Sequence, residues 1–155
     1  MMRATQITVG RKFAVVFEHD EDFFEALDRF CRESGVRAGY LTFIGGFSHA
    51  RLVGTCEPLE HPERPLWEEV EVENLEVLGN GTLAWDPEEE RVAPHIHLSA
   101  GLKADSADGR TSHLQGGTVQ FLAEVVIEEW SAPEVTRVRN PDLYDVPLLR
   151  FAQRG

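Results

Sequence analysis

The sequence predicts an α+β fold, in which one principal helix is accompanied by strands along most of the chain. Only the segment between Asp20 and Gly35 repeats apolar side chains at helical spacing. After Gly35, short β-branched and aromatic runs alternate with polar turns. A length of 155 residues fits one domain, and we find neither an internal repeat nor a linker. We therefore expect a single domain over residues 1–155.

The first elements are a strand and the helix. Lys12–Glu18 is an aromatic and β-branched run typical of a strand. Asp20 is the expected N-cap of the helix, because an aspartate there accepts hydrogen bonds from the free N–H groups of the first turn. Arg32 followed by Gly35 is typical of a helix end. The apolar positions repeat at helical spacing and predict a face buried against a sheet: Phe23, Phe24, Leu27, Phe30 and Cys31.

Strands are expected along most of the remaining chain. Gly45 and Gly46 interrupt the first of them and predict a bulge or the close approach of another backbone. Glu57–Pro65 is typical of an acidic, proline-rich connection, and the tail from Pro133 is expected to wrap the surface. The expected strands are Tyr40–Phe47, Leu52–Thr55, Trp67–Glu73, Glu76–Trp85, Ala93–Ala100 and Thr118–Trp130.

Charge and composition exclude several classes of protein. The chain has 27 acidic against 15 basic residues, a net charge of -12, which argues against unaided binding to nucleic acid. The acidity is local, since residues 57–90 hold 12 acidic residues and one basic residue. No apolar run approaches the roughly 20 residues of a membrane span. The two cysteines, Cys31 and Cys56, are expected to pack as free thiols, so we expect a cytoplasmic protein.

The richest chemistry lies in the sequence Pro-His-Ile-His-Leu at residues 94–98. Side chains alternate along a strand, so His95 and His97 project from one face, about 6.6 Å apart along the chain. His113 follows 16 residues later, where the returning chain can bring it alongside. Three imidazoles with one open position are the ligand set of a catalytic zinc site. Two interpretations stay open: a three-histidine metal site, or surface histidines on a polar strand face.

Several segments resemble, in order, the strand motifs of the PPC domain, a family conserved in plants and prokaryotes. The resemblance covers about residues 10–130, which leaves 131–155 as a C-terminal tail. It is carried by Glu76-Val-Leu-Gly-Asn-Gly-Thr-Leu-Ala, Pro94-His-Ile-His-Leu-Ser, Asp108-Gly-Arg, His113-Leu-Gln-Gly-Gly-Thr-Val and Ala123-Glu-Val-Val-Ile.

The resemblance implies a largely antiparallel sheet packed against one principal helix, and assembly into homotrimers. It also implies zinc, or another divalent transition metal, on His95, His97 and His113. Prokaryotic members typically carry two glycines before the third histidine, where this chain has Thr111 and Ser112. Members are often described as candidate DNA-binding proteins. The plant proteins bind DNA through a separate Gly-Arg-Pro core, which this sequence lacks, so we expect no DNA binding without an added basic arm.

Two functions are consistent with these observations. The first is a homotrimeric, metal-binding regulatory or interaction module that can take a protein partner and has no membrane attachment. The second is a zinc-dependent hydrolase or hydratase acting on an unknown small molecule, with Glu124 as the candidate catalytic proton acceptor. Glu124 is flanked by apolar residues on both sides, so a partner is expected for its carboxylate: a ligating histidine, a metal-bound water, or an arginine at a subunit interface.

Overall fold

The computed structural model describes residues 2–55, 68–103 and 108–152. It has one α-helix among β-strands, which confirms the α+β fold. Cys56 and the expected connection Glu57–Pro65 lie outside the described residues. The elements are β1 (Thr8–Glu18), α1 (Phe23–Ser34), β2 (Gly39–Val53), β3 (Glu69–Asp86), β4 (Arg91–Leu102), β5 (Gly109–Ala132), β6 (Val135–Asn140), the 3-10 turn η1 (Pro141–Leu143) and β7 (Val146–Phe151).

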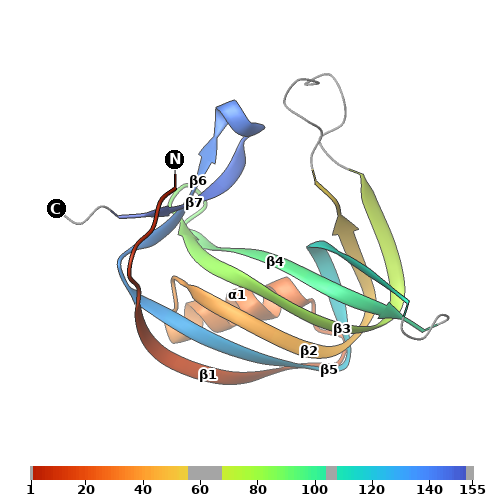
Figure 1. Cartoon of the computed structure of the whole chain (residues 1–155). Helices are drawn as coiled ribbons and strands as arrows, with labels where there is room; N and C mark the ends of the chain where they lie inside the picture. Colours follow the sequence, from red (N-terminus) through yellow and green to blue (C-terminus); the bar gives the residue numbers. More distant parts are fainter. Residues whose placement is uncertain (1, 56–67, 104–107, 153–155) are drawn as a thin grey trace.

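The strands form one strongly curved sheet that is almost entirely antiparallel (Figure 1). β5 is long enough to pair with three strands: its first residues pair with β4, and later residues pair with β2 and β1. Because β2 also pairs with β3, and β3 with β4, the pairings of β2, β3, β4 and β5 close into a cycle. This closure brings the start of β5 beside β4, although the connection between them contains the undescribed residues 104–107.

The helix begins two residues later than expected. Asp22, not Asp20, is the N-cap, and its carboxylate accepts hydrogen bonds from the N–H groups of Phe24 and Glu25. Asp20 instead adopts a left-handed conformation, with φ of 67°, in the turn after β1. By residue type, either aspartate could be the N-cap. Asp20 lies instead in the turn that is hydrogen-bonded to β5, so the helix begins after Asp22. Gly35 ends the helix with φ of 72°, as expected.

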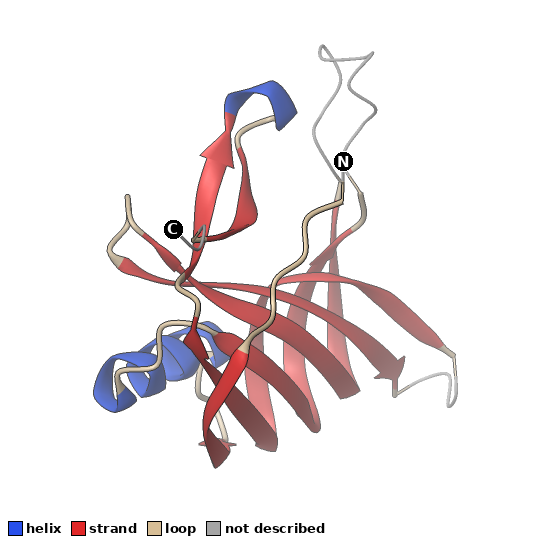
Figure 2. Ribbon diagram, turned by 60° about the vertical axis from the view of Figure 1, so that its left-hand side comes forward, coloured by secondary structure: helices blue, strands red, loops and turns tan. Residues whose placement is uncertain are grey.

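Helix α1 lies against one face of the sheet (Figure 2). Phe23, with no exposed surface, is central to this packing: its ring contacts those of Phe17 on β1 and of Phe43 and Phe47 on β2. Cys31 is buried on the same helix face, and burial raises the pKa of its thiol to about 12, with a smaller contribution from Asp28. The helix therefore buries its aromatic stripe, as its spacing predicts.

The two faces of the sheet differ along every central strand. The covered face, toward α1, carries buried side chains such as Leu41, Val77, Ile96 and Val125. The open face carries the alternate side chains. Strand register aligns them in rows, one of which joins Val16, Glu124, Ile44, Leu78 and Ser99. The apolar residues of the open face that are at least half exposed include Val16, Ile44, Leu78 and Val126.

Up to Ala132 the strands are fewer and longer than the sequence predicts, and β6 and β7 are strands that it does not predict. Tyr40–Phe47 and the first residues of the expected strand Leu52–Thr55 belong to one strand, β2. Of the expected strand Trp67–Glu73, Trp67 lies outside the described residues, and Glu69–Glu73 is continuous with Glu76–Trp85 in β3. The expected bulge at the glycine pair is confirmed, since the register with β5 shifts between Gly45 and Gly46. A Cβ on Gly45 would lie 2.4 Å from the carbonyl oxygen of Leu122, so the two backbones approach too closely for a side chain.

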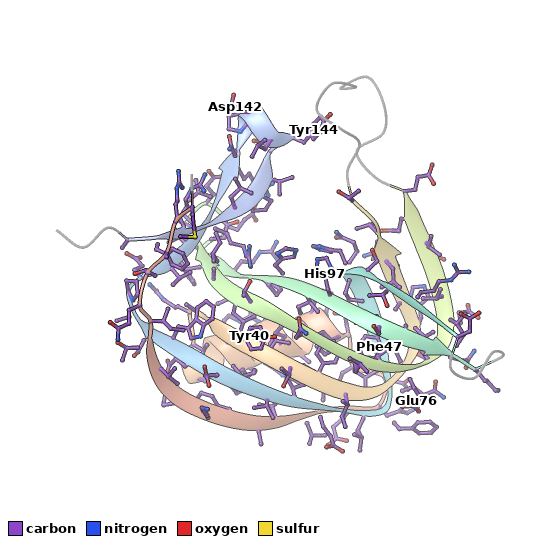
Figure 3. All side chains as sticks on the ribbon, in the orientation of Figure 1. Tyr40, Phe47, Glu76, His97, Asp142 and Tyr144 are labelled. Atoms are coloured by element: carbon purple, nitrogen blue, oxygen red, sulfur yellow. The ribbon has the colours of Figure 1, made fainter. Side chains whose placement is uncertain are left out.

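The tail forms a hairpin rather than an irregular wrap. β6 and β7 pair antiparallel, and one parallel bridge between Trp85 and Thr136 joins β6 to β3. Figure 3 shows Asp142 and Tyr144 at the tip of this hairpin, away from the sheet. Pro141 is accommodated because it lies in the turn η1, outside the β6–β7 ladder.

None of the helices within residues 2–55, 68–103 and 108–152 is long and apolar enough to cross a membrane.

Candidate metal centre

Three histidines meet on the open face, where β4 lies between β3 and β5. Alternation places His95 and His97 on the same face of β4, while Ile96 between them is fully buried on the covered face. His113 on β5 is the register partner of His97. Residues directly opposite in an antiparallel pair point to the same side, so all three imidazoles share one surface. Figure 3 shows His97 on β4, on the side from which the tail hairpin rises.

The three rings are close enough to share one ion. The Nε2 atoms of His95 and His97 are 3.1 Å apart, and one nitrogen from each histidine lies within 4.8 Å of the others. The ring centroids of the three pairs are separated by 5.1, 4.9 and 5.2 Å. Two nitrogens bound tetrahedrally to zinc at ~2.0–2.1 Å would lie about 3.3 Å apart. The cluster is therefore already near the spacing of a metal site.

The surroundings favour neutral imidazoles, the form that binds metal. Partial burial of the ring lowers the pKa of His95 to about 4, and the positive charges of Arg137 and the other two histidines add to the effect. The pKa of His113 is lowered as well, first by burial and then by His97 and Arg137. At neutral pH both rings offer a lone pair without first losing a proton.

Thr111 and Ser112, which stand where the family resemblance implies two glycines, are accommodated beside the cluster. The hydroxyl of Thr111 lies 2.9 Å from that of Ser99, its register partner on β4. The hydroxyl of Ser112, on the other side of the strand, donates a hydrogen bond to the carbonyl oxygen of Val53. Thr111 and Ser112 thus join β5 to β4 and β2, and His113 still lies opposite His97.

Glu124, the candidate proton acceptor from the sequence, and His49, a further histidine of the chain, lie apart from this cluster. Glu124 is exposed on the open face, on the far side of β2 and β3 from β4, so it is not the buried carboxylate that its apolar neighbours predict. Its role as proton acceptor stays a prediction. His49 on β2 lies 3.9 Å from a carboxylate oxygen of Glu71. Within the described residues, no Asp, Glu or Cys joins the three histidines as a fourth ligand.

Arg137 is a charged residue near the cluster that sequence reasoning missed. Only 4% of it is exposed, and its guanidinium reaches from β6 across β3 and β4. Nε donates a hydrogen bond to the carbonyl oxygen of Ala93 at 2.9 Å, and Nη2 donates to the hydroxyl and carbonyl oxygens of Thr82 at 2.6 and 3.3 Å. Thr82 is the register partner of His95, so the guanidinium lies beside the histidine cluster.

The donor set fits a divalent transition metal such as zinc. Three imidazole nitrogens converge, two of them belong to rings with a lowered pKa, and the described residues leave a fourth position for an exchangeable ligand. Catalytic zinc sites have this composition, whereas structural sites are closed by a fourth protein ligand. Nickel, copper and iron also accept imidazole ligands.

Residues 4–131 match the Plants and Prokaryotes Conserved (PCC) domain. The chain belongs to the PCC domain family. No curated protein sequence matches it. Among solved structures, a metal-containing protein from Archaeoglobus fulgidus is 20% identical, with a TM-score of 0.80 over 95% of this chain and 98% of the other. A plant- and prokaryote-conserved protein from Pyrococcus horikoshii is 17% identical, with a TM-score of 0.80 over 99% of this chain and 100% of the other.

A more distant likeness is to α-acetolactate decarboxylase from Bacillus subtilis, which is 10% identical with a TM-score of 0.52. It covers 92% of this chain and 61% of the enzyme. At these identities the likenesses concern the fold. Other similar structures include proteins named as candidate DNA-binding proteins from Ralstonia eutropha and Bacteroides thetaiotaomicron.

The PCC domain match contains all three histidines and ends before Arg137. The sequence offered only a weak signal for this arginine, namely a mildly basic tail with Arg137, Arg139, Arg150 and Arg154. Composition does not distinguish a buried arginine from exposed ones. The distinction comes from β6, which bridges to β3 at Thr136 and so turns the next side chain toward Thr82.

Proposed function

We propose that this PCC domain binds one zinc ion, or another divalent transition metal, on His95, His97 and His113. The convergence of three imidazole nitrogens within 4.8 Å on one sheet face carries the proposal. The lowered pKa values of His95 and His113 also favour a functional site over solvated surface histidines. The fold likeness to a protein named as metal-containing is consistent with it.

Metal content tests this proposal directly. Elemental analysis and native mass spectrometry of protein prepared without chelator should give about one metal ion per chain. His97→Ala should lose the metal, because two imidazoles hold zinc far more weakly than three. His49→Ala is the matched control, since His49 lies apart from the cluster and pairs with Glu71. Wild-type protein that remains metal-free, even with added zinc, would overturn the proposal.

We further propose that the chain assembles into homotrimers and acts in the cytoplasm as a regulatory or interaction module. The open face supports assembly, because several apolar side chains on it are at least half exposed and form a contiguous patch. Direct DNA binding has little support. The Arg137 side chain is buried, and Arg139 lies within 4.0 Å of carboxylates of Glu88 and Glu89, so these two arginines do not form an exposed basic patch for a phosphate backbone.

The second candidate is a metal-dependent hydrolase or hydratase acting on a small molecule. The observation that favours it is the lack of a fourth protein ligand within the described residues. A zinc ion bound there would supply Lewis-acid chemistry and activate water near neutral pH. The chain's own contribution is to hold three imidazoles close together and to keep one side of the cluster accessible, since His95 and His97 are exposed.

The two candidates differ in whether the metal exchanges a ligand. The experiment replaces zinc in the purified protein by cobalt, because the visible spectrum of bound cobalt reports changes in coordination. If the fourth position is open, added azide should shift the spectrum of the cobalt protein. A spectrum that does not respond to azide would indicate a closed, structural site and would exclude the enzyme.

A further inference from the structure

Arg137 is a buried cation without an anionic partner in the described residues. Its three hydrogen bonds go to neutral acceptors, the carbonyl oxygens of Ala93 and Thr82 and the hydroxyl of Thr82. No carboxylate of residues 2–55, 68–103 and 108–152 is within 4.0 Å of its guanidinium. A charge that is 96% buried normally has a counter-charge, because neutral hydrogen bonds offset only part of its desolvation cost. Burial accordingly lowers the pKa of Arg137 itself.

The bonding leaves one part of the guanidinium unused. Nε and Nη2 bind the backbone and side chain of β3 and β4, which fixes the plane of the group. No described atom accepts a hydrogen bond from Nη1, and this nitrogen is not among the fully buried atoms without a partner. Its two N–H groups are therefore the donors of Arg137 that remain for a ligand.

The histidine cluster lies beside the guanidinium of Arg137. Thr82, which holds Nη2, is directly opposite His95 in the sheet, where side chains are about 4.5–5.5 Å apart at Cβ. The charge of Arg137 acts on both His95 and His113. With a divalent metal on the histidines, the site would carry three positive charges and no acidic side chain from the described residues. Such a site favours an anion, held by charge-assisted hydrogen bonds.

We propose that Arg137 forms a carboxylate-binding subsite beside the histidine centre, so that the PCC domain takes small organic carboxylates as ligands. The carboxylate accepts hydrogen bonds from Nη1 while a second oxygen of the same molecule faces the metal. Only one guanidinium nitrogen remains for the ligand, and a carboxylate oxygen can accept a charge-assisted hydrogen bond from it. The proposal rests on the proposed metal centre, and it specifies the class of molecule that this centre binds.

An alternative role for Arg137 is purely structural, as a clamp that holds β6 against β3 and β4. The two roles make different predictions. A clamp needs the bonds to Ala93 and Thr82 and is indifferent to dissolved carboxylates. A subsite also distinguishes a carboxylate from a neutral molecule of the same shape. Glycolate and glycolamide provide that comparison, because glycolate is a minimal molecule with a carboxylate and a second oxygen.

The test measures binding of glycolate and glycolamide to zinc-loaded protein by calorimetry. Wild-type protein should bind glycolate at least tenfold more tightly than glycolamide. Arg137→Gln should lose about 10- to 100-fold in glycolate affinity, the loss expected for a hydrogen bond between charged groups. Its metal content should remain that of the wild type. Arg139→Gln is the matched control, since Arg139 is on the same strand but faces Glu88 and Glu89.

A second variant keeps the test decisive if circular dichroism shows that Arg137→Gln does not fold. Thr82→Val removes the hydroxyl that holds Nη2 but preserves the shape of the side chain, and should weaken glycolate binding. Equal binding of glycolate and glycolamide by the wild type, or unchanged glycolate affinity in a folded Arg137→Gln, would overturn the subsite while the metal centre stands. Failure to bind metal, measured on the same samples, would overturn both.

Discussion

The two faces of the sheet carry different kinds of side chain. On the covered face, aromatic rings from β1, α1 and β2 pack around Phe23, and side chains there are almost fully buried. On the open face, β4 and β5 carry three histidines, and β1, β2, β3 and β5 carry exposed apolar side chains. Adjacent residues therefore serve different ends: Ile96 stabilises the core, while His95 and His97 on either side of it form the candidate metal centre.

This division explains why a ligand site is tolerated on a small domain. Burial against α1 supplies the free energy of folding, which leaves the opposite side chains free to carry polar chemistry that would be costly in the core. Arg137 is an exception to the division. It is buried like a core residue yet lies on the side of the histidines, held there by the tail hairpin.

The largest effect on folding is expected from substitutions on the covered face. Val125 and Val126 are neighbours on β5, 1% and 51% exposed, so the same substitution can be made on each face. Val125→Ala should lower the free energy of unfolding by about 2–3 kcal/mol, from lost burial and the cavity left behind. The loss of strand propensity is common to both variants and cancels in the comparison.

Val126→Ala is the control, measured in the same urea denaturation experiment, and should change the free energy of unfolding by about 0.5 kcal/mol or less. Both measurements should be made at several protein concentrations, which separates folding from assembly. If the two variants are equally destabilised, the faces are not energetically distinct.

Periodicity was enough to predict which residues of one helix or strand share a face, but not which strands lie side by side. The spacing of Phe23, Leu27 and Cys31 indicates a buried helix face, and all three are buried. The alternation at His95 and His97 indicates one shared strand face, which the structure has. Both inferences need only local geometry. The positions of His113 and Arg137 depend instead on which strands pair and in what register, and a single sequence does not specify that.

Two other differences between prediction and structure, the N-cap of the helix and the exposure of Glu124, also depend on contacts that are distant in the sequence. Asp20 and Asp22 both suit an N-cap, and the contact of the turn with β5 selects the second. Glu124 has apolar neighbours on both sides in sequence, which predicts burial. It is exposed because it lies on the face of the sheet away from α1. Leu122 and Val126 lie on the same face and are exposed as well. Apolar neighbours in the sequence are thus consistent with a core and with an exposed patch. The position of α1 decides which face of the strand is the core.

A smaller effect is expected at the start of the helix that covers the sheet. The carboxylate of Asp22 accepts hydrogen bonds at 2.9 Å from two N–H groups of the first turn. Asp22→Ala should lower the free energy of unfolding by about 1 kcal/mol, the usual cost of losing an N-cap. Asp20→Asn is a suitable control, because asparagine also tolerates the left-handed conformation of this residue. Urea denaturation of both variants measures the difference, and a larger loss for Asp20→Asn would contradict the assignment of the cap.

The smallest effect on folding, and the largest on assembly, is expected in the centre of the open face. Ile44 is 57% exposed and lies opposite Glu124 in the β2–β5 register. Ile44→Lys should leave the free energy of unfolding of the monomer within about 0.5 kcal/mol of the wild type, because the new ammonium group faces the Glu124 carboxylate. It should nevertheless abolish the proposed trimer, since a charge replaces an apolar contact in the patch.

Native mass spectrometry and light scattering distinguish the two states directly. Wild-type protein should have the mass of three chains, and Ile44→Lys that of one. Val70→Lys is a matched control, because Val70 is 50% exposed but lies near the start of β3, away from the patch around Ile44. A monomeric wild type, or a trimer that persists in Ile44→Lys, would show that the apolar patch is not the assembly surface. Loss of the trimer in Val70→Lys alone would move that surface toward the start of β3.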